Sequence, residues 1–220
     1  MRLNQFIAAA SGLSRRAADA AIQNGQVTIN GRLANVGHIV NNADHIQLDG
    51  ALQKLPTHST TILLNKPTGY VCSRNGQGNQ TIYKLLPVEY HGLKPIGRLD
   101  KDSSGLLLLT DDGHLANTLT HPRYAKEKIY IVTLDKPLTA ADKVKIEQGV
   151  KVDNYISRLQ LSEIHGSSWR VTISQGRNRQ IRRTFAEQGY TVEKLQRTVF
   201  GPYHLTNLKP GEWRISLNKH

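Results

Sequence analysis

Two acidic side chains stand in a polar turn directly before a strongly apolar run. Asp100 and Asp102 are followed by Gly105 and then by four successive leucines at 106–109. Such a run favours a buried strand, so the turn is expected where the chain enters the core. An acid at that point is partly desolvated and can face a ligand as a nucleophile, although an isolated Leu-Asp pair more often caps a turn. Asp100 is therefore a candidate catalytic carboxylate.

A basic helix near the C-terminal end is the second chemically distinctive feature. The periodicity of residues 178–188 predicts a helix on which Arg179, Arg182 and Arg183 share one face, with Ile181 on the adjacent apolar face. A carboxylate in apolar surroundings tends to protonate, and a neighbouring arginine keeps it ionised. This helix can therefore offer a guanidinium to a carboxylate. The simpler alternative is a solvated basic face over a stripe of core residues.

The balance of charge favours a nucleic-acid partner. The 220 residues carry a formal net charge of +12, an excess that points to an anionic partner, nucleic acid before membrane surface. Lysines and arginines outnumber acids by 10 to 3 in residues 170–220 but only by 4 to 3 in residues 1–50. The basic surface is thus expected beside the arginine helix. A merely basic protein is the alternative.

Other features narrow the class of protein. Cys72 is the single cysteine, so an intramolecular disulfide is impossible and a reducing, cytoplasmic compartment is expected. No apolar run reaches the length of about eighteen residues that a membrane span needs. The nine histidines form no cluster with metal-ligand spacing, so we expect no metal. No obligate protein partner is evident, and a monomer is expected.

The first part of the chain reads as a compact module. Residues 1–50 predict two short helices and a small sheet. Gly12 ends the first helix and Ser14 caps the second, while Asn30-Gly31 suits a tight hairpin turn between strands.

The rest of the chain predicts an α+β fold with a mixed, mostly antiparallel sheet. Residues 51–59 have linker composition, and residues 60–220 form the larger domain. Its expected strands are at 60–65, 105–110, 128–134, 159–164, 169–174, 192–199 and 213–217, and its expected helices at 111–119, 138–148 and 178–188.

The N-terminal module resembles the S4 RNA-binding domain over nearly its whole length. The resemblance is carried by Arg2-Leu3-Asn4-Gln5, Gly12-Leu13-Ser14-Arg15-Arg16, Gly25-Gln26-Val27-Thr28-Ile29-Asn30-Gly31 and the Val40…Asp44…Ile46…Leu48 tail. In that family a helix pair presents basic residues to folded RNA, which implies RNA contact by Arg2, Arg15 and Arg16. Taken alone, the Arg15-Arg16 pair would read as a solvated first turn.

The larger domain resembles the pseudouridine synthases, in particular the branch named for the small-subunit ribosomal enzyme, which also carries an S4 module. Four motifs in order carry the resemblance: Lys66-Pro67-Thr68-Gly69-Tyr70-Val71, the run from Gly97-Arg98-Leu99-Asp100 to Asp111-Asp112-Gly113, Lys128-Ile129-Tyr130, and Gly176-Arg177-Asn178-Arg179-Gln180-Ile181-Arg182-Arg183. Gln175 and Thr184 depart from the residues common in the family, an acid and a methionine, and bear on subfamily rather than activity.

The resemblance implies isomerisation of a uridine within RNA. The uracil is detached from C1′ of the ribose, turned, and rejoined through C5, so no redox change occurs and no cofactor is needed. Asp100 then acts as the nucleophile, and Arg182 matches the active-site arginine that holds Asp100 ionised. Tyr130 matches the active-site tyrosine, whose ring can stack on uracil and whose hydroxyl can assist at C5, although a packed strand tyrosine is the plainer alternative.

Further residues are expected to bind the substrate. Ile181 would contact the uracil ring, and Lys128, Arg179 and Arg183 complete the substrate-binding set. Because Arg98 precedes Asp100 by two residues, both side chains point to the same side of an extended segment. Arg98 would fill the gap that a flipped-out uridine leaves behind, or contact a phosphate.

Two other classes of function compete with this one. An inactive domain tethered to ribosomal RNA by the S4 module is one, and the intact Asp100, Tyr130 and Arg182 set argues against it. A hydrolase is the other, with Asp102 as the second carboxylate of a glycosidase. The resemblance marks Asp102 as a turn residue instead. Ribosomal RNA is the expected substrate, and the wording of the closing motif favours the large subunit over the small.

Overall fold

A computed structural model describes residues 1–216 of the chain. It contains two compact units, the first formed by Met1–Thr60 with Asp111–Gly113 and the second by Thr61–Thr110 with the chain from His114 onward. Leu217, the last residue of the strand expected at 213–217, and the final residues of the larger domain expected at 60–220 lie outside the described residues.

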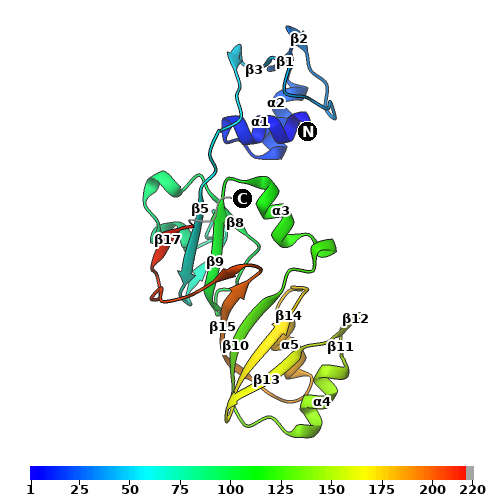
Figure 1. Ribbon diagram of the computed structural model, residues 1–220, viewed down its shortest axis with the longest axis vertical. Helices are drawn as coiled ribbons and strands as arrows, with labels where there is room; N and C mark the ends of the chain where they lie inside the picture. Colours follow the sequence, from blue (N-terminus) through cyan, green and yellow to red (C-terminus); the bar gives the residue numbers. More distant parts are fainter. Residues whose placement is uncertain (217–220) are drawn as a thin grey trace. The chain divides into compact units, whose positions relative to one another are not determined.

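The first unit packs two helices against a small antiparallel sheet of order β2-β1-β3-β4. Ser14 caps the second helix by accepting a hydrogen bond from Ala17 N (3.1 Å), and Gly12 ends the first with a φ of 78°, as predicted. Asn30 and Gly31 form the tight turn between β1 and β2, both with positive φ. The elements are α1 (Leu3–Ser11), α2 (Arg15–Gln23), β1 (Val27–Ile29), β2 (Arg32–Leu33), β3 (Ile46–Leu48) and β4 (Ala51–Leu52) (Figure 1).

Strand β4 changes one boundary that the sequence predicts. Leu52 pairs with Gln47 and Ala51 with Leu48, so the first two residues of the segment expected as a 51–59 linker belong to the small sheet. The composition of these two residues carries no strand signal, and the pairing comes from the tight turn that precedes them.

The second unit is built on a nine-stranded mixed sheet, mostly antiparallel, as the sequence predicts. Its main path has the order β13-β14-β10-β15-β9-β5-β17, and only β15 and β9 run parallel within it (Figure 1). The sheet strands are β5 (Thr61–Lys66), β8 (Lys94–Ile96), β9 (Ser104–Thr110), β10 (Lys128–Leu134), β13 (Gln160–His165), β14 (Ser168–Ile173), β15 (Val192–Phe200), β16 (Tyr203–His204) and β17 (Trp213–Ile215).

Smaller elements and helices surround this sheet. They are β6 (Tyr70–Val71), β7 (Gln80–Thr81), η1 (Ile82–Leu85), η2 (Val88–Tyr90), α3 (Gly113–Thr120), η3 (Pro122–Tyr124), α4 (Ala140–Gln148), β11 (Val150–Val152), β12 (Tyr155–Ser157) and α5 (Gln180–Ala186). Strands β11 and β12 form a separate hairpin that apolar periodicity does not predict.

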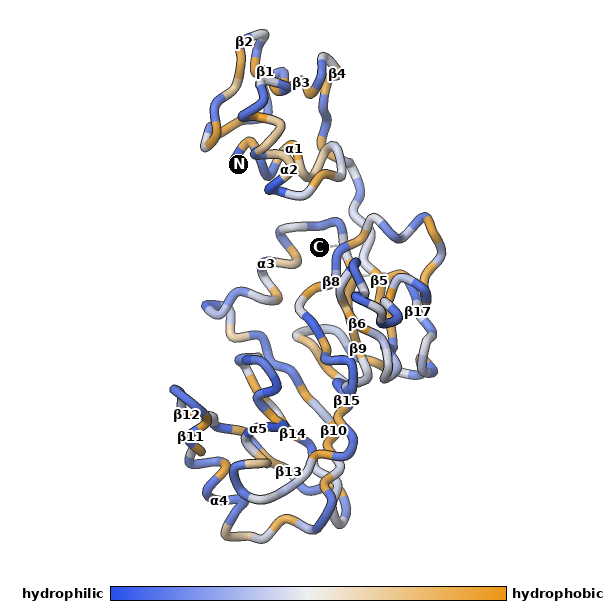
Figure 2. The backbone as a smooth tube through the Cα atoms, turned by 180° about the vertical axis from the view of Figure 1, so that it is seen from behind, coloured by the Kyte–Doolittle hydropathy of each residue, from blue (hydrophilic) through white to orange (hydrophobic). Residues whose placement is uncertain are grey.

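The four leucines of β9 are explained by burial on both faces of the sheet. Leu107 and Leu109 join the core that includes residues of α5, whereas Leu106 and Leu108 join a second core that includes residues of α3. All four side chains are fully buried, and each contributes roughly 1.5–3 kcal/mol relative to an exposed leucine. In Figure 2, these leucines give β9 the orange colour of hydrophobic residues. This strand therefore fixes the turn that precedes it at the edge of the core.

Helix α5 is shorter than the sequence predicts. The expected helix covered residues 178–188, but α5 begins at Gln180 because Arg179 has left-handed backbone angles, with φ 48° and ψ 28°. Arg179 is therefore not on a continuous helical face with Arg182 and Arg183. This conformation affects which arginine pairs with Asp100 and which with Asp102.

An acid in the first turn of α4 provides a test of the fold's electrostatics. Asp142 accepts hydrogen bonds from Lys145 Nζ (2.9 Å), Thr139 Oγ1 (2.8 Å) and the Tyr190 hydroxyl (2.9 Å). These bonds, that of Lys145 first, lower the pKa of Asp142 to about 2 from its ordinary value of 3.8. Because the folded pKa lies below the unfolded one, the stabilisation is complete above about pH 4 and is lost as the pH falls toward 2.

We expect Asp142→Asn to lower the free energy of unfolding at neutral pH, with a difference from wild type that shrinks as the pH falls below about 4. Urea denaturation of both proteins across this pH range measures the difference. A difference that keeps its neutral value into the acid range would contradict the assigned ionisation.

Candidate active site

A cleft of about 270 Å³ lies in the second unit, beside the turn that precedes β9. Its walls come from this turn, from β10 and β15, from the end of β14, and from the segment that leads into α5. Of the eight catalytic and substrate-binding residues expected from the sequence, six line the cleft: Arg98, Asp100, Lys128, Tyr130, Arg179 and Ile181. The other lining residues are Gly97, Leu99, Ser103, Thr120, Ile173, Gly176, Arg177, Asn178, Gln180, Leu195, Arg197 and Phe200.

A buried lysine holds the turn that carries Asp100. Lys66, at the end of β5, is fully buried and its Nζ donates to the main-chain carbonyls of Pro67 (3.0 Å), Asp100 (3.0 Å) and Ser103 (2.7 Å). Burial lowers the pKa of Lys66. The backbone of the turn is thus fixed from beneath, while the Asp100 carboxylate remains 35% exposed and faces the cleft. The sequence places Lys66 only in the strand that opens the domain.

Asp102, rather than Asp100, is the acid that holds the arginines. Both Nη atoms of Arg179 donate to the two carboxylate oxygens of Asp102, each at 3.0 Å. Arg182 approaches the same carboxylate with Nε at 3.3 Å and donates through Nη2 to the Asp102 carbonyl at 2.9 Å. The Arg179 hydrogen bonds lower the pKa of Asp102. The Asp102 carboxylate is therefore paired with Arg179 and close to Arg182, and Asp102 is not among the residues that line the cleft.

Among the residues that the structure describes, Arg182 forms no ion pair with Asp100, the contact expected from the sequence. Arg182 donates to Asp102 and, through Nη1, to the Val192 carbonyl at 2.5 Å, while the arginine nearest to the Asp100 carboxylate is Arg179, with Nη1 at 3.8 Å. The cause is the left-handed backbone of Arg179, which turns its side chain toward both acids. Arg182, on α5, instead donates a hydrogen bond to the backbone of the turn at Asp102.

The apolar wall of the cleft contains the residues expected to contact the base. Tyr130 on β10 and Ile181 on α5 are 7% and 4% exposed, and both belong to the core on that side of the sheet. Lys128 lies two residues before Tyr130, with its Nζ 5.1 Å from the centre of the Phe200 ring. Burial, followed by the charge of Arg197, lowers the pKa of Lys128. A flat ring can lie between these side chains with cations at its edge.

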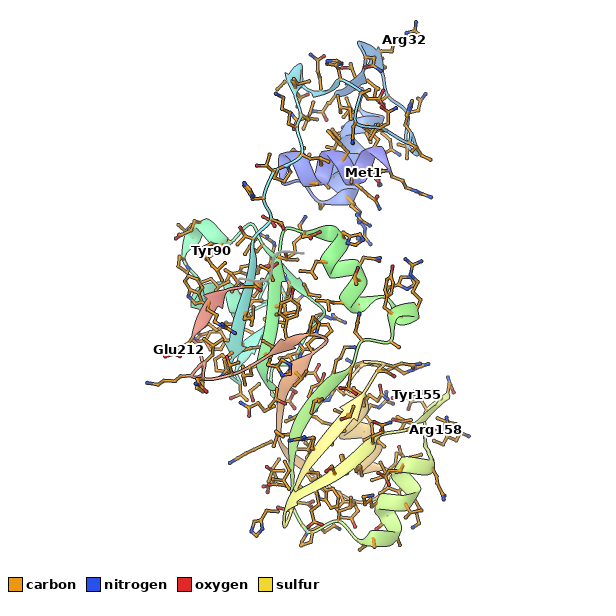
Figure 3. The ribbon with its side chains drawn as sticks, viewed as in Figure 1. Met1, Arg32, Tyr90, Tyr155, Arg158 and Glu212 are labelled. Carbon is orange, nitrogen blue, oxygen red and sulfur yellow. The ribbon has the colours of Figure 1, made fainter. Side chains whose placement is uncertain are left out.

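Arg183 does not line the cleft. It forms an ion pair with Asp153, in the turn between β11 and β12, so its expected place in the substrate-binding set is not supported by its position. Arg177 does line the cleft, with its guanidinium carbon 4.3 Å from the centre of the Tyr155 ring. Tyr155 lies at the start of β12 (Figure 3). Sequence reasoning placed Arg177 in the closing motif but gave it no role.

The residues expected to bind RNA in the first unit are all exposed. Arg15 and Arg16 are the first two residues of α2, and Arg2 directly precedes α1. Within residues 1–216, no group of three or more His, Cys, Asp or Glu side chains could hold a metal ion. No helix in the same part of the chain is long and apolar enough to cross a membrane.

Comparison with protein families matches two parts of the chain in order. Residues 1–46 match the S4 domain, and residues 60–187 match the family described as RNA pseudouridylate synthase. The chain therefore belongs to the RNA pseudouridylate synthase family, and its activity is that of an RNA pseudouridine synthase, an isomerase.

Known pseudouridine synthases are similar in sequence to nearly the whole chain. The ribosomal small subunit pseudouridine synthase A of Salmonella typhimurium is 38% identical, over 97% of this chain and 95% of the relative. The dual-specificity RNA pseudouridine synthase RluF of Escherichia coli is 36% identical, over 97% of this chain and 74% of the relative. A crystal structure of a pseudouridylate synthase superposes with a TM-score of 0.72 at 34% identity, covering 98% of this chain and 96% of that one.

Proposed function

We propose that the protein converts a uridine of ribosomal RNA to pseudouridine, with Asp100 as the nucleophile and without a cofactor. The observation that carries the proposal is the partly exposed carboxylate of Asp100 in the cleft. Lys66 holds the backbone of the turn on which Asp100 lies. Substrate RNA is expected in the cytoplasm, and the protein is expected to act as a monomer.

The reaction can be followed atom by atom. The Asp100 carboxylate forms a bond to C1′ as the bond from C1′ to N1 of uracil breaks, and the electron pair of that bond stays on the uracil. After the base turns, C5 bonds to C1′ and displaces the carboxylate. The proton lost from C5 is balanced by one gained at N1. No outside group is added and no electron is transferred, which is why no cofactor is required.

The side chains around Asp100 fit separate tasks in this sequence. Tyr130 and Ile181 enclose the base and limit its escape while it is detached. Arg179 places positive charge beside the Asp100 carboxylate. Arg98 is exposed at the cleft, where it can occupy the gap left by a flipped uridine. Enclosure of this kind is needed because a freed uracil must be recaptured at another atom.

Chemical mapping of pseudouridines tests the substrate directly. The closing motif favours large-subunit RNA, whereas the Salmonella relative is named for the small subunit, so both ribosomal RNAs are mapped in cells with and without the gene. Loss of one or a few ribosomal pseudouridines without the gene is expected. Intact ribosomal RNA with a missing pseudouridine in another RNA would contradict the proposed substrate.

The exposed arginines of the first unit provide a second test. Arg15→Ala combined with Arg16→Ala is expected to weaken binding of structured RNA about tenfold or more and to reduce the salt dependence of binding. The single-turnover rate at saturating RNA should stay near that of wild type, since neither residue belongs to the cleft. Arg32→Ala, on β2 of the same unit, is the matched control (Figure 3). An unchanged affinity in the double variant would show that α2 is not an RNA contact.

Metal removal provides a third test. Activity is expected to survive exhaustive EDTA treatment when RNA folding is maintained with a monovalent salt, because the proposed reaction is internally balanced. Pseudouridine formation on a short, unstructured substrate is the measurement that separates the enzyme from RNA folding. A loss of activity that only zinc or manganese restores would contradict the proposed mechanism.

A further inference from the structure

Arg197 is a buried cation in the cleft, and within residues 1–216 it forms no ion pair with an acid. It lies on β15, is only 2% exposed, and its Nε donates to the Leu106 carbonyl at 2.8 Å. Its Nη2 is also buried and has no hydrogen-bond partner among the residues that the structure describes. A buried guanidinium that lacks both an acid and a full set of acceptors is costly to maintain. The unused donor therefore needs an explanation from function.

Neighbouring groups hold both the side chain and the backbone of Arg197. Its carbon lies 4.7 Å from the centre of the Phe200 ring. On the other strand, Gly105 is the parallel partner of Arg197, and a Cβ at Gly105 would lie 2.2 Å from the Arg197 carbonyl oxygen. The glycine permits this close approach of β9 and β15. A charge fixed in this way needs no reorganisation when a ligand arrives.

The surroundings of Arg197 place it beside the base rather than beside a phosphate. Tyr130 is its cross-strand partner on β10, and such partners are near neighbours. Lys128, a second cation without an acid at this end of the cleft, lies against the same Phe200 ring. Of the exposed arginines of the cleft, Arg179 is paired with Asp102, and Arg98 and Arg177 are better placed for the phosphates of the RNA.

We propose that Arg197 is a catalytic residue that donates through Nη2 to a carbonyl oxygen of the flipped uracil and stabilises the negative charge of the detached base. This rests on the proposed function above. When the C1′–N1 bond breaks, the electron pair moves onto uracil and its charge is shared with the ring carbonyl oxygens. The negative charge thus moves from Asp100, as it bonds to C1′, to the base. A fixed cation at the destination lowers the barrier for that transfer.

The test uses Arg197→Gln, which removes the charge, and Arg197→Lys, which keeps it. Arg170→Gln is the matched control, since Arg170 is exposed on β14, which β10 separates from β15, and does not line the cleft. Single-turnover rates at saturating RNA are expected to fall about 100-fold or more in Arg197→Gln and by a smaller factor in Arg197→Lys. RNA affinity and its salt dependence should match those of wild type. Thermal unfolding shows whether each variant is folded.

A substrate with a better leaving group distinguishes charge stabilisation from a structural role. RNA with 5-fluorouridine at the target position releases a less basic base, which needs less help from a cation. The rate of disappearance of the target nucleoside is therefore expected to rise more, relative to uridine RNA, in Arg197→Gln than in wild type. A structural defect would lower both rates by the same factor and would overturn the proposal.

Other outcomes are equally decisive. Loss of affinity with a smaller salt dependence, at an unchanged saturated rate, would make Arg197 a phosphate contact and overturn the proposal. An Arg197→Gln variant as active as wild type would overturn it as well. Failure of the wild-type enzyme to form pseudouridine in ribosomal RNA would instead contradict the proposed function. The wild-type assay shows this result before any Arg197 variant is measured.

Discussion

Replacing Asp100 with asparagine is expected to abolish pseudouridine formation while RNA binding stays nearly intact. Asparagine keeps the shape of the side chain but cannot supply the anion that bonds to C1′. The turn should stay in place, because Lys66 holds its main-chain carbonyls rather than the carboxylate. A decrease of at least about 1,000-fold in the single-turnover rate is expected, with a change of less than about threefold in RNA affinity.

The measurement needs two controls. Glu163→Gln removes one negative charge from an exposed position on β13, outside the cleft, and should be as active as wild type. Mass spectrometry of the Asp100→Asn protein excludes deamidation back to aspartate. Activity within tenfold of wild type would remove Asp100 from the role of nucleophile.

Much of the positioning framework could be predicted from sequence because it is local. The four leucines of β9 specify a strand buried on both faces, and Ser14, Thr139 and Gly12 specify helix ends through their own side chains or backbone freedom. These signals depend on neighbours within a few residues. The turn that carries Asp100 follows from β9, so the candidate carboxylate could be placed at the edge of the core.

The arrangement of the arginines could not be predicted in the same way. Helical periodicity assumes that the helix is continuous through the arginines, but a non-glycine residue, Arg179, takes left-handed angles just before α5. Asp102 then accepts two hydrogen bonds from Arg179, a pairing between residues 77 apart in the chain. Periodicity contains no information about a contact of that range, so the pairing of Arg179 with Asp102 could not be predicted.

The two buried cations were missed for a related reason. Lysines and arginines are seldom fully buried, so a sequence reading places Lys66 and Arg197 at the surface. Their partners are main-chain carbonyls far along the chain: Asp100 is 34 residues from Lys66, and Leu106 is 91 residues from Arg197. For Lys66, a cation at the end of the strongly apolar strand β5 is a usable signal, whereas β15 contains several polar residues and gives none for Arg197.

Arg182 is expected to act through Asp102, and the expected effect is large. It donates to the Asp102 carbonyl and approaches its carboxylate, while also bonding the Val192 carbonyl, so it joins the Asp100 turn to the start of β15. Arg182→Ala should lower the single-turnover rate at saturating RNA about 100-fold, since small displacements of a catalytic group have effects of that size. Arg182→Lys should recover little, because a single ammonium cannot replace the planar guanidinium whose two Nη atoms donate to the Val192 and Asp102 carbonyls.

A double-mutant cycle with Asp102→Asn tests whether Arg182 acts through Asp102. If Arg182 acts through the Asp102 carboxylate, that contact is already weakened in Asp102→Asn, which keeps the main-chain carbonyl that accepts from Arg182. Adding Arg182→Ala should then lower the rate by less than about 100-fold. If Arg182 instead acts directly on Asp100 or on substrate, the two losses should multiply, since they would remove independent interactions. Arg183→Ala is the matched control, because Arg183 is on the same helix but pairs with Asp153 away from the cleft. Multiplicative losses, or wild-type turnover in Arg182→Lys, would contradict a role through Asp102.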